Sequence, residues 1–191
     1  MKENVDYIFG IRAVIEAIKA GRDIDKVLVK KDFNGELADE LFHTMHTFGI
    51  VSQRVPVERI NRVTRKNHQG VVAFLSPVTY YRLDELVPTL FESGKNPVIL
   101  LLDGITDVRN FGAIARTCEC AGVDAIIIPD KNSVSVNADA VKTSAGALLR
   151  IPVVRVKSIK AAIRQLQDSG YTVVGATEKA TEDYTSFDYT V

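Results

Sequence analysis

The chain has little that would mark a secreted, metal-binding or membrane protein. It holds only two cysteines, Cys118 and Cys120, which lie two positions apart. That spacing supports neither a zinc site by itself nor a disulfide framework, so the sequence predicts a reduced protein of the cytoplasm. No apolar run is long enough for a transmembrane helix, and the polar start at residues 1–6 differs from a secretory leader. We therefore expect no membrane partner.

Net charge is a second missing signal. Lysine and arginine together number 24, and aspartate and glutamate together also number 24. Such a balance gives no overall attraction to nucleic acid, although a local basic patch can still supply one. The 46% hydrophobic content is ordinary for a globular protein. The length of 191 residues suits one large domain or two small ones.

Three common site motifs are also absent from the sequence. It has no Gly-x-Gly-x-x-Gly fingerprint for a dinucleotide, no phosphate loop ending in Gly-Lys-Ser or Gly-Lys-Thr, and no Gly-x-Ser-x-Gly elbow for a serine nucleophile. His43 and His46 lie one helical turn apart, a spacing that could hold a metal. No carboxylate or cysteine completes such a site nearby, which favours an exposed helix face. We expect no metal.

Hydrophobic spacing predicts a small α/β unit over residues 1–76. Its expected helices and strands alternate, with helices over 11–18, 35–48 and 57–63 and strands over 26–30, 50–55 and 70–75. The composition shifts in the next segment, 77–96: three prolines and two adjacent tyrosines lie in the stretch from Ser76 to Pro97. We interpret it as a linker that contains a short helix within 83–91.

A second α/β unit is predicted over residues 97–191. Its expected strands cover 98–102, 124–128, 152–156 and 171–175, and its expected helices cover 111–121, 137–148 and 159–168. Strands and helices that alternate at this spacing are typical of a parallel sheet with helices on its faces. The fold class is therefore α/β, in two domains.

The most informative segment runs from residue 98 to residue 116. An apolar run ends at Asp103, a polar loop follows, and Asn110 opens a helical pattern that carries Arg116. Ligands of parallel α/β proteins gather at the carboxyl ends of strands and at helix N-termini. Gly112 and Arg116 are one helical turn apart, and Asn110 is expected to cap the helix. The pattern predicts a cation beside free backbone N–H groups, suited to a phosphate or ribose; the alternative is a capped helix with a surface arginine.

A basic stretch between residues 54 and 68 is the second candidate site. Its cationic or potentially cationic side chains are opposed only by Glu58, and they are Arg54, Arg59, Arg62, Arg65, Lys66 and His68. The excess of arginine, together with neighbouring amides, suits phosphates, unpaired bases and 2′-hydroxyls. The sequence thus predicts an RNA-binding surface, with a solvated helix face as the alternative.

The segment 103–116, Asp-Gly-Ile-x-Asp-x-Arg-Asn-Phe-Gly-Ala-Ile-x-Arg, resembles the first motif of the SpoU (TrmH-like) group of SPOUT RNA ribose 2′-O-methyltransferases. The unit over residues 8–73 resembles the substrate-binding domain of that group, which is related to the L30e/L7Ae fold. The resemblance implies an L30e-like RNA-binding domain at 1–76 and a SPOUT (α/β knot) domain at 97–191. It implies methylation of a ribose 2′-hydroxyl in rRNA or tRNA, with S-adenosyl-L-methionine as cofactor, by a homodimer.

The resemblance also assigns site residues. Asn110 and Arg116 match the active-site asparagine and arginine of the family, and Gly175, Ala176 and Thr177 match a first loop of its cofactor site. The second and third motifs of the family, Gly-x-Glu-x-x-Gly and Ile-Pro-Met…Ser-Leu-Asn, do not occur in this sequence. Those motifs supply the knot, most of the cofactor pocket and much of the dimer surface. We therefore expect a chain truncated before the knot, with a sheet edge left open.

Arg116 is the residue expected to carry the chemistry. An arginine stays protonated at neutral pH because its pKa lies above about 12. A cation that holds the adjacent phosphate and stabilises the developing alkoxide is therefore favoured over a general base, and Asn110 would orient that arginine or the loop. Two other classes stay open: a noncatalytic RNA-binding module, and a nucleotide- or small-molecule-binding α/β protein that is indifferent to RNA.

Overall fold

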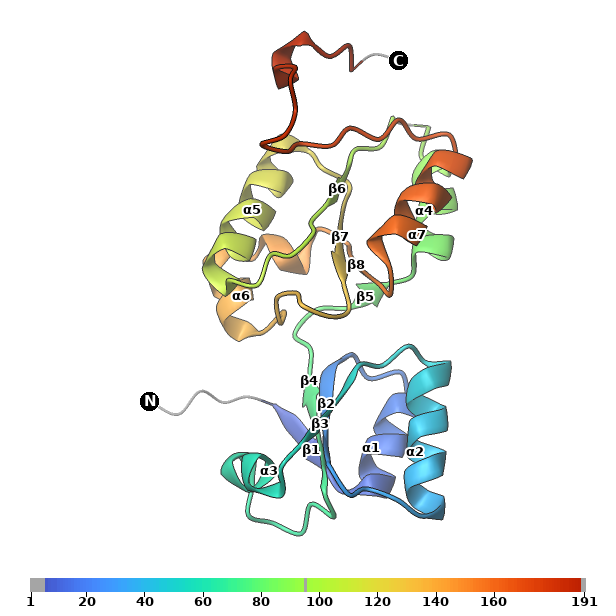
Figure 1. Cartoon of the computed structure of the whole chain (residues 1–191), viewed down its shortest axis with the longest axis vertical. Coiled ribbons are helices and arrows are strands. Elements are labelled where there is room, and N and C mark those ends of the chain that lie inside the picture. Colours follow the sequence, from blue (N-terminus) through green and yellow to red (C-terminus); the bar gives the residue numbers. More distant parts are fainter. Residues whose placement is uncertain (1–5, 95, 190–191) are drawn as a thin grey trace.

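The computed structural model describes residues 6–94 and 96–189, and they form two α/β domains that follow each other along the long axis of the molecule (Figure 1). Each domain has a four-stranded sheet. Within these residues, no helix combines the length and the apolar character that crossing a membrane requires. The α/β class that the sequence predicts is confirmed.

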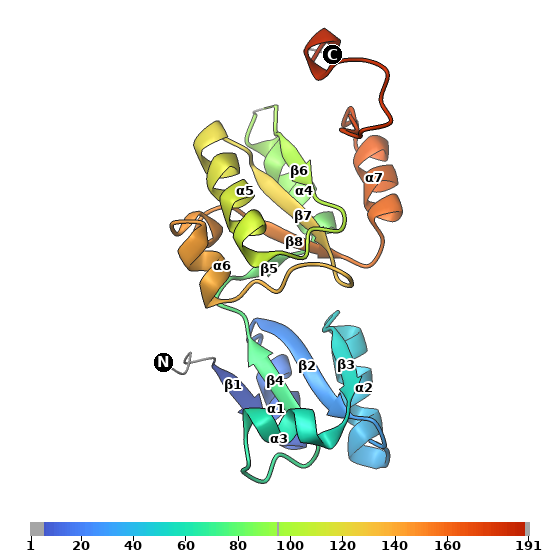
Figure 2. The same ribbon diagram turned by 60° about the vertical axis from the view of Figure 1, so that its left-hand side comes forward.

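The first domain has a mixed sheet with the strand order β1-β4-β2-β3. Its elements are β1 (Tyr7–Phe9), α1 (Ile11–Lys19), β2 (Ile24–Lys30), α2 (Glu36–Thr47), β3 (Ser52–Val55), α3 (Val57–Val63) and β4 (Val71–Leu75). Strand β4 runs antiparallel to β1 and β2, whereas β2 and β3 are parallel. Helices α1 and α2 cover one face of the sheet, and α3 packs on the other through the buried Ile60 (Figure 2).

The second domain has a parallel sheet with the strand order β5-β8-β7-β6. Its elements are β5 (Tyr80–Tyr81), α4 (Leu83–Glu92), β6 (Ile99–Leu101), α5 (Val108–Ala121), β7 (Ala125–Pro129), α6 (Ala138–Thr143), the 3-10 turn η1 (Ala147–Leu149), β8 (Val153–Val156), α7 (Ile159–Asp168) and the 3-10 turn η2 (Tyr184–Ser186). Helices α5 and α6 pack on one face, and α4 and α7 pack on the other. The parallel sheet predicted from the alternation of elements is confirmed.

The segment 77–96 differs from the expected linker. Strand β5 pairs with β8, and the buried Leu83, Leu86 and Val87 of α4 join the core beneath α7. Most of the segment therefore belongs to the second domain, because its apolar residues follow helical spacing and have a sheet face to cover. The connection between the two sheets is only the stretch 76–79.

Three further expectations are corrected by the structure. The sequence analysis missed β1, which is three residues long. The helix expected over 137–148 ends at Thr143, because Ala145 and Gly146 adopt positive φ angles of 53° and 85°. Residues 171–175 do not form the expected strand: residues 172–177 are exposed, and the stretch joins neither of the two sheets that the described residues form. Strand β6 pairs only with β7 among the described residues, so one of its edges is open.

Candidate active site at the carboxyl end of the parallel sheet

The loop after β6 leads directly into α5. The helix begins at Val108, three residues before the expected start at residue 111, because the Asp107 side chain caps it by accepting a hydrogen bond of 2.7 Å from the backbone N–H of Asn110. The expectation that Asn110 is the cap is therefore wrong: Asn110 lies in the first turn, and it is exposed. The structure nevertheless places it at a helix N-terminus beyond the carboxyl end of a parallel strand, where ligands of such folds bind.

Arg116 lies on the same helix, about 9 Å further along its axis at 1.5 Å per residue. It is exposed, and among the described residues its guanidinium forms no hydrogen bond or ion pair. Two arginines elsewhere in the chain differ: Arg150 pairs with Glu119 at 2.8 Å, and Arg155 pairs with Asp25. Arg109, in the first turn of α5, is exposed like Arg116 and also lacks an ion pair with a described residue. Arg116 is thus a cation available to an anionic ligand.

Gly112 has a different role from the one expected. A Cβ at this position would lie 2.7 Å from Cβ of Thr143 and 3.0 Å from the backbone N of Ser144. The missing side chain therefore permits the close contact between α5 and α6. Because Gly112 lies within the helix, its N–H belongs to the helical ladder and not to a free donor cluster.

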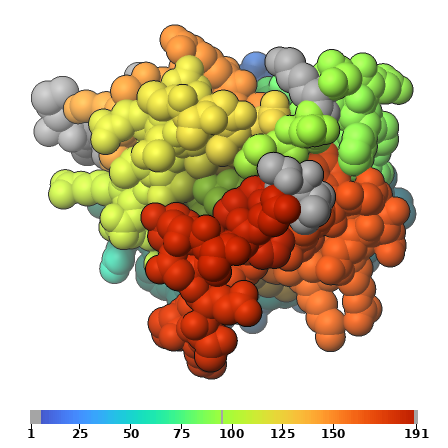
Figure 3. All heavy atoms as spheres, turned by 90° about the horizontal axis from the view of Figure 1, so that it is seen from above, coloured from blue at the N-terminus to red at the C-terminus, as the bar shows by residue number. Residues whose placement is uncertain are grey.

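Gly175, Ala176 and Thr177 are not brought together with Asn110 and Arg116. They are exposed in the stretch that follows α7 and crosses the end of the second domain where the parallel strands begin (Figure 1). Figure 3, which looks down on this end, shows the described part of the stretch after α7 lying over it. The Phe91 and Tyr171 rings, 5.0 Å apart, hold the start of the stretch against the end of α4. The loop that contains Asp103 lies at the opposite end of the sheet.

The basic stretch divides into side chains that hold the first domain together and side chains that face solvent. Arg54 donates to the backbone oxygen of Lys31 at 2.9 Å, and its guanidinium carbon lies 5.0 Å from the centre of the Phe42 ring. His68 accepts from the backbone N–H of Gly70 through Nδ1, so Nε2 donates to Asn61 Oδ1 at 2.8 Å. These two residues are therefore committed to internal contacts.

The other four cations of the stretch are exposed, and they are Arg59, Arg62, Arg65 and Lys66. None of them forms an ion pair with another described residue. They lie on α3 and in the turn before β4, and this turn is at the end of the first domain that points away from the second (Figure 1). The candidate RNA surface and the loop after β6 are thus separate sites.

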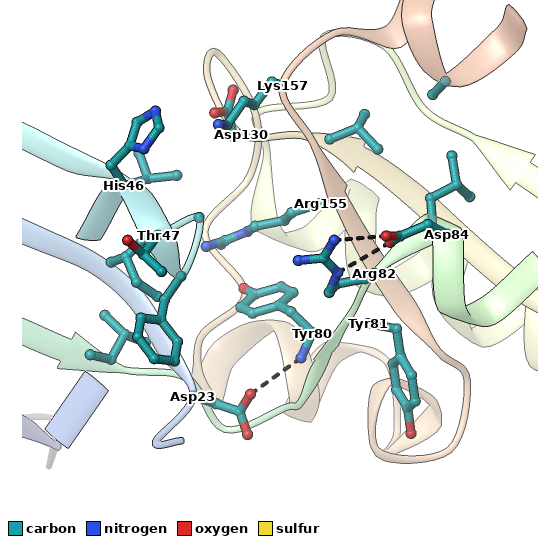
Figure 4. A pocket seen from close by; sticks show the side chains of 18 of the residues that line it. Asp23, His46, Thr47, Tyr80, Tyr81, Arg82, Asp84, Asp130, Arg155 and Lys157 are labelled. Atoms are coloured by element: carbon teal, nitrogen blue, oxygen red, sulfur yellow. Dashed lines mark hydrogen bonds and ion pairs between the residues drawn. The ribbon is translucent and has the colours of Figure 1, made fainter. Parts of the chain in front are cut away.

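Sequence reasoning missed a cavity between the domains. It has a volume of about 660 Å³, and both domains line it: Asp23, His46 and Thr47 lie on the first domain, and Tyr80, Asp130, Arg155 and Lys157 on the second (Figure 4). Asp130 and Lys157 directly follow β7 and β8, so the cavity opens at the carboxyl end of the parallel sheet. The sequence signals for a contact beside this cavity were Arg155, the one charge in the apolar strand β8, and Asp25, the one acidic residue in β2.

The fold and this site define a two-domain α/β protein whose candidate active site lies at the carboxyl end of a parallel sheet. Residues 7–81 match the family model "RNA 2'-O ribose methyltransferase substrate binding", and residues 97–190 match the model of the SpoU rRNA methylase family. The chain therefore belongs to the SpoU (TrmH-like) family of methyltransferases, as its sequence motif indicated.

Relatives and solved structures agree with this assignment. A protein of Staphylococcus saprophyticus named "Putative TrmH family tRNA/rRNA methyltransferase" is 35% identical over 181 residues, which cover 95% of this chain and 73% of the relative. The Bacillus subtilis protein YacO is 32% identical over 188 residues, which cover 98% of this chain and 76% of YacO. An AdoMet-bound rRNA methyltransferase from Sinorhizobium meliloti has the same fold, with a TM-score of 0.51 at 24% identity. The match covers 96% of this chain and 66% of that one.

Proposed function

We propose that the chain methylates ribose 2′-hydroxyl groups in rRNA or tRNA, in the cytoplasm, with S-adenosyl-L-methionine as the methyl donor. The observation that carries the proposal is Arg116, which closes the first motif on α5, is exposed and has no ion pair with a described residue. The match of the first domain to an RNA substrate-binding model supports RNA as the substrate. The AdoMet-bound Sinorhizobium meliloti relative supports the cofactor.

In this proposal Arg116 and Asn110 act on the RNA. The guanidinium of Arg116 binds a phosphate next to the target ribose through a planar pair of N–H donors. The same positive charge stabilises the oxyanion that forms when the 2′-hydroxyl loses its proton. Asn110, at the helix N-terminus, orients the ribose or the loop. The chain supplies charge and position at this step, and the proton passes to solvent or to another base.

The described arrangement does not form a pocket for the cofactor from Gly175, Ala176 and Thr177, because these residues lie at the other end of the sheet from Asn110. The right-handed connections of parallel sheets nevertheless allow residues 171–177 a second position in the fold. A right-handed crossover that leaves β8 through α7 places the next strand beside the open edge of β6. A strand over 171–175 in that position would end beside Asp103. We propose that the cofactor-binding form of the protein has this fifth strand.

A titration of S-adenosyl-L-methionine into the Gly175→Val variant tests this assignment and the function together. Nothing lies within 4 Å of a Cβ at Gly175, so the variant is expected to keep the stability of the parent chain. If the segment binds the cofactor, calorimetry should show saturable binding near one site per chain for the parent and at least about tenfold weaker binding for the variant, a loss of about 1.4 kcal/mol. Equal affinity for both chains would refute the role of Gly175.

The basic surface should dominate RNA binding by the first domain. Replacing Arg62 and Arg65 with glutamate should weaken binding to structured RNA and lower the slope of log K against log salt by about 1.4, because each phosphate contact to a single strand contributes about 0.7. Filter binding at several salt concentrations measures both. The charge-matched control replaces the exposed Arg12 on α1 and Arg22 just after it, because α1 covers the other face of the sheet and neither arginine forms an ion pair with a described residue. An equal loss in the control would show that only net charge matters.

A noncatalytic RNA-binding protein is the second candidate function. The separation of Gly175, Ala176 and Thr177 from Asn110 in the described arrangement favours it, and so does the exposed basic surface on α3. Binding of RNA by a folded sample that takes up no S-adenosyl-L-methionine would decide for this candidate.

We also propose that the methyltransferase is a homodimer, which light scattering of the intact chain tests.

A further inference from the structure

The strongest polar contact between the two domains is centred on one buried carboxylate. Asp25 of β2 is 5% exposed, and it lies between the buried Ile24 and the half-buried Lys26, in a strand that also buries Val27. A carboxylate in such a place is costly unless charges and hydrogen bonds compensate it. Most of the groups that compensate the negative charge of Asp25 lie in the second domain.

Arg155, at the end of β8, supplies the opposite charge. Its Nη2 lies 2.5 Å from Asp25 Oδ1, and its Nη1 donates to the backbone oxygen of Asp25 at 2.6 Å. The Tyr80 hydroxyl donates to the same Oδ1 at 3.2 Å, and Ser135 donates to Oδ2. Lys26 of the first domain, 3.9 Å from Oδ2, adds a second positive charge. Three segments of the second domain therefore converge on one residue of the first.

Tyr80 fits this role as a permanent donor. The Arg155 guanidinium carbon lies 3.8 Å from the centre of its ring, which closes the contact against solvent (Figure 4). Burial raises the pKa of Tyr80 well above its ordinary value, with Arg155 opposing and Asp25 adding to the rise. The hydroxyl consequently stays protonated. Its neighbour Thr79 donates to Asp23 at 2.9 Å, so the chain connection itself is tied to the first domain.

The same contact reaches the candidate active site through the core. Ser135 stands between Val134 and Val136, which are buried in the core cluster that contains Phe111 of α5. Alternate residues of this short loop thus face the first domain and the core. Phe111 is fully buried and directly follows Asn110. A shift of Asp25 relative to Ser135 would therefore be passed to the helix that carries Asn110.

We propose that Asp25 and Arg155, with Tyr80 and Ser135, form an interdomain lock that sets the orientation of the RNA-binding domain relative to the candidate active site. Asp25 and Arg155 are positioning residues, since neither lies in the loop after β6. The orientation part of this proposal stands on the contacts alone. The part that concerns RNA methylation rests on the proposed function.

The orientation part is tested by small-angle X-ray scattering of the whole chain. Asp25→Asn leaves the largely buried Arg155 without its carboxylate, and Arg155→Gln leaves the buried Asp25 with only the positive charge of Lys26 at 3.9 Å. Each variant should therefore open the contact and raise the radius of gyration. The double variant leaves neither charge alone, and it should be no more open than either single variant. Arg82→Gln is the control, because Arg82 lines the same cavity but pairs with Asp84 and Glu85 of its own domain. An unchanged radius in both single variants would overturn the lock.

The functional part is tested by methyl transfer to RNA with the same variants. Opening should lower kcat by about tenfold or more while KM for the cofactor stays unchanged, because the two substrates bind but are held in the wrong geometry. The double variant should recover part of the loss. Opened variants with full turnover would overturn the positioning role. If the parent chain shows no methyl transfer, the proposed function fails, and scattering alone decides whether the lock exists.

Discussion

Replacing Arg116 with alanine is expected to lower the rate of methyl transfer to RNA by about 10²–10³-fold, the usual cost of removing one preorganised group that stabilises an oxyanion. The side chain is exposed and has no partner among the described residues, so its loss should leave the fold intact. Affinity for S-adenosyl-L-methionine should stay unchanged, because the proposed role is toward the RNA. Single-turnover assays with saturating cofactor measure the effect.

Two further substitutions make this experiment specific. Arg116→Lys keeps the charge but loses the planar pair of donors, and it should recover only part of the rate. Arg164→Ala removes an equally exposed arginine from α7 and should have no effect on turnover. A parallel loss of turnover and cofactor affinity in Arg116→Ala would contradict the assignment, because the residue would then act on the cofactor site or on the fold.

Hydrophobic spacing predicted most of the local structure because each element buries one side. Residues Val14, Ile15 and Ile18 recur at helical spacing, and all three are buried under the first sheet. Helix α3 at 57–63 and helix α7 at 159–168 have the predicted bounds. Local spacing could not predict the strand at 171–175 correctly, because a strand also needs a partner, and Val173 and Val174 are exposed with none. An apolar pattern shows that a segment can form a strand, and a neighbouring strand must be available for it to do so.

In the candidate site, too, the sequence predicted arrangements within one helix but not contacts between residues far apart in the chain. Asn110 and Arg116 were found from a motif within one helix, where spacing along the chain fixes the arrangement. Asp25 and Arg155 meet across a separation of 130 residues. Each reads by itself as an unexplained charge in a buried strand. Only the docking of two sheets makes them partners, so the interdomain lock was beyond the reach of periodicity.

Gly112 lies between Asn110 and Arg116 on α5, where the helix packs against α6. Replacing it with a slightly larger residue should lower the stability of the fold more than any other small substitution in α5. In a helix, alanine is about 1 kcal/mol more favourable than glycine. At Gly112 the added Cβ meets Cβ of Thr143 at 2.7 Å, Cγ2 of Thr143 at 2.9 Å and the backbone N of Ser144 at 3.0 Å. The Cβ of Thr143 and the backbone N of Ser144 cannot move away unless α6 moves with them. Overpacking of this kind costs about 1–3 kcal/mol, and valine, which lacks the helix preference of alanine, should cost more.

We therefore expect Gly112→Val to lower the free energy of unfolding by at least about 2 kcal/mol, with a fall in Tm of roughly 4–8 °C for a chain of this size. Urea denaturation and thermal unfolding measure it. Gly175→Ala is the matched control, since its Cβ meets nothing within 4 Å, and it should leave stability within about 0.5 kcal/mol of the parent. An equally stable Gly112→Val protein would show that α6 can yield. The contact between α5 and α6 would then not be what holds Asn110 and Arg116 in place.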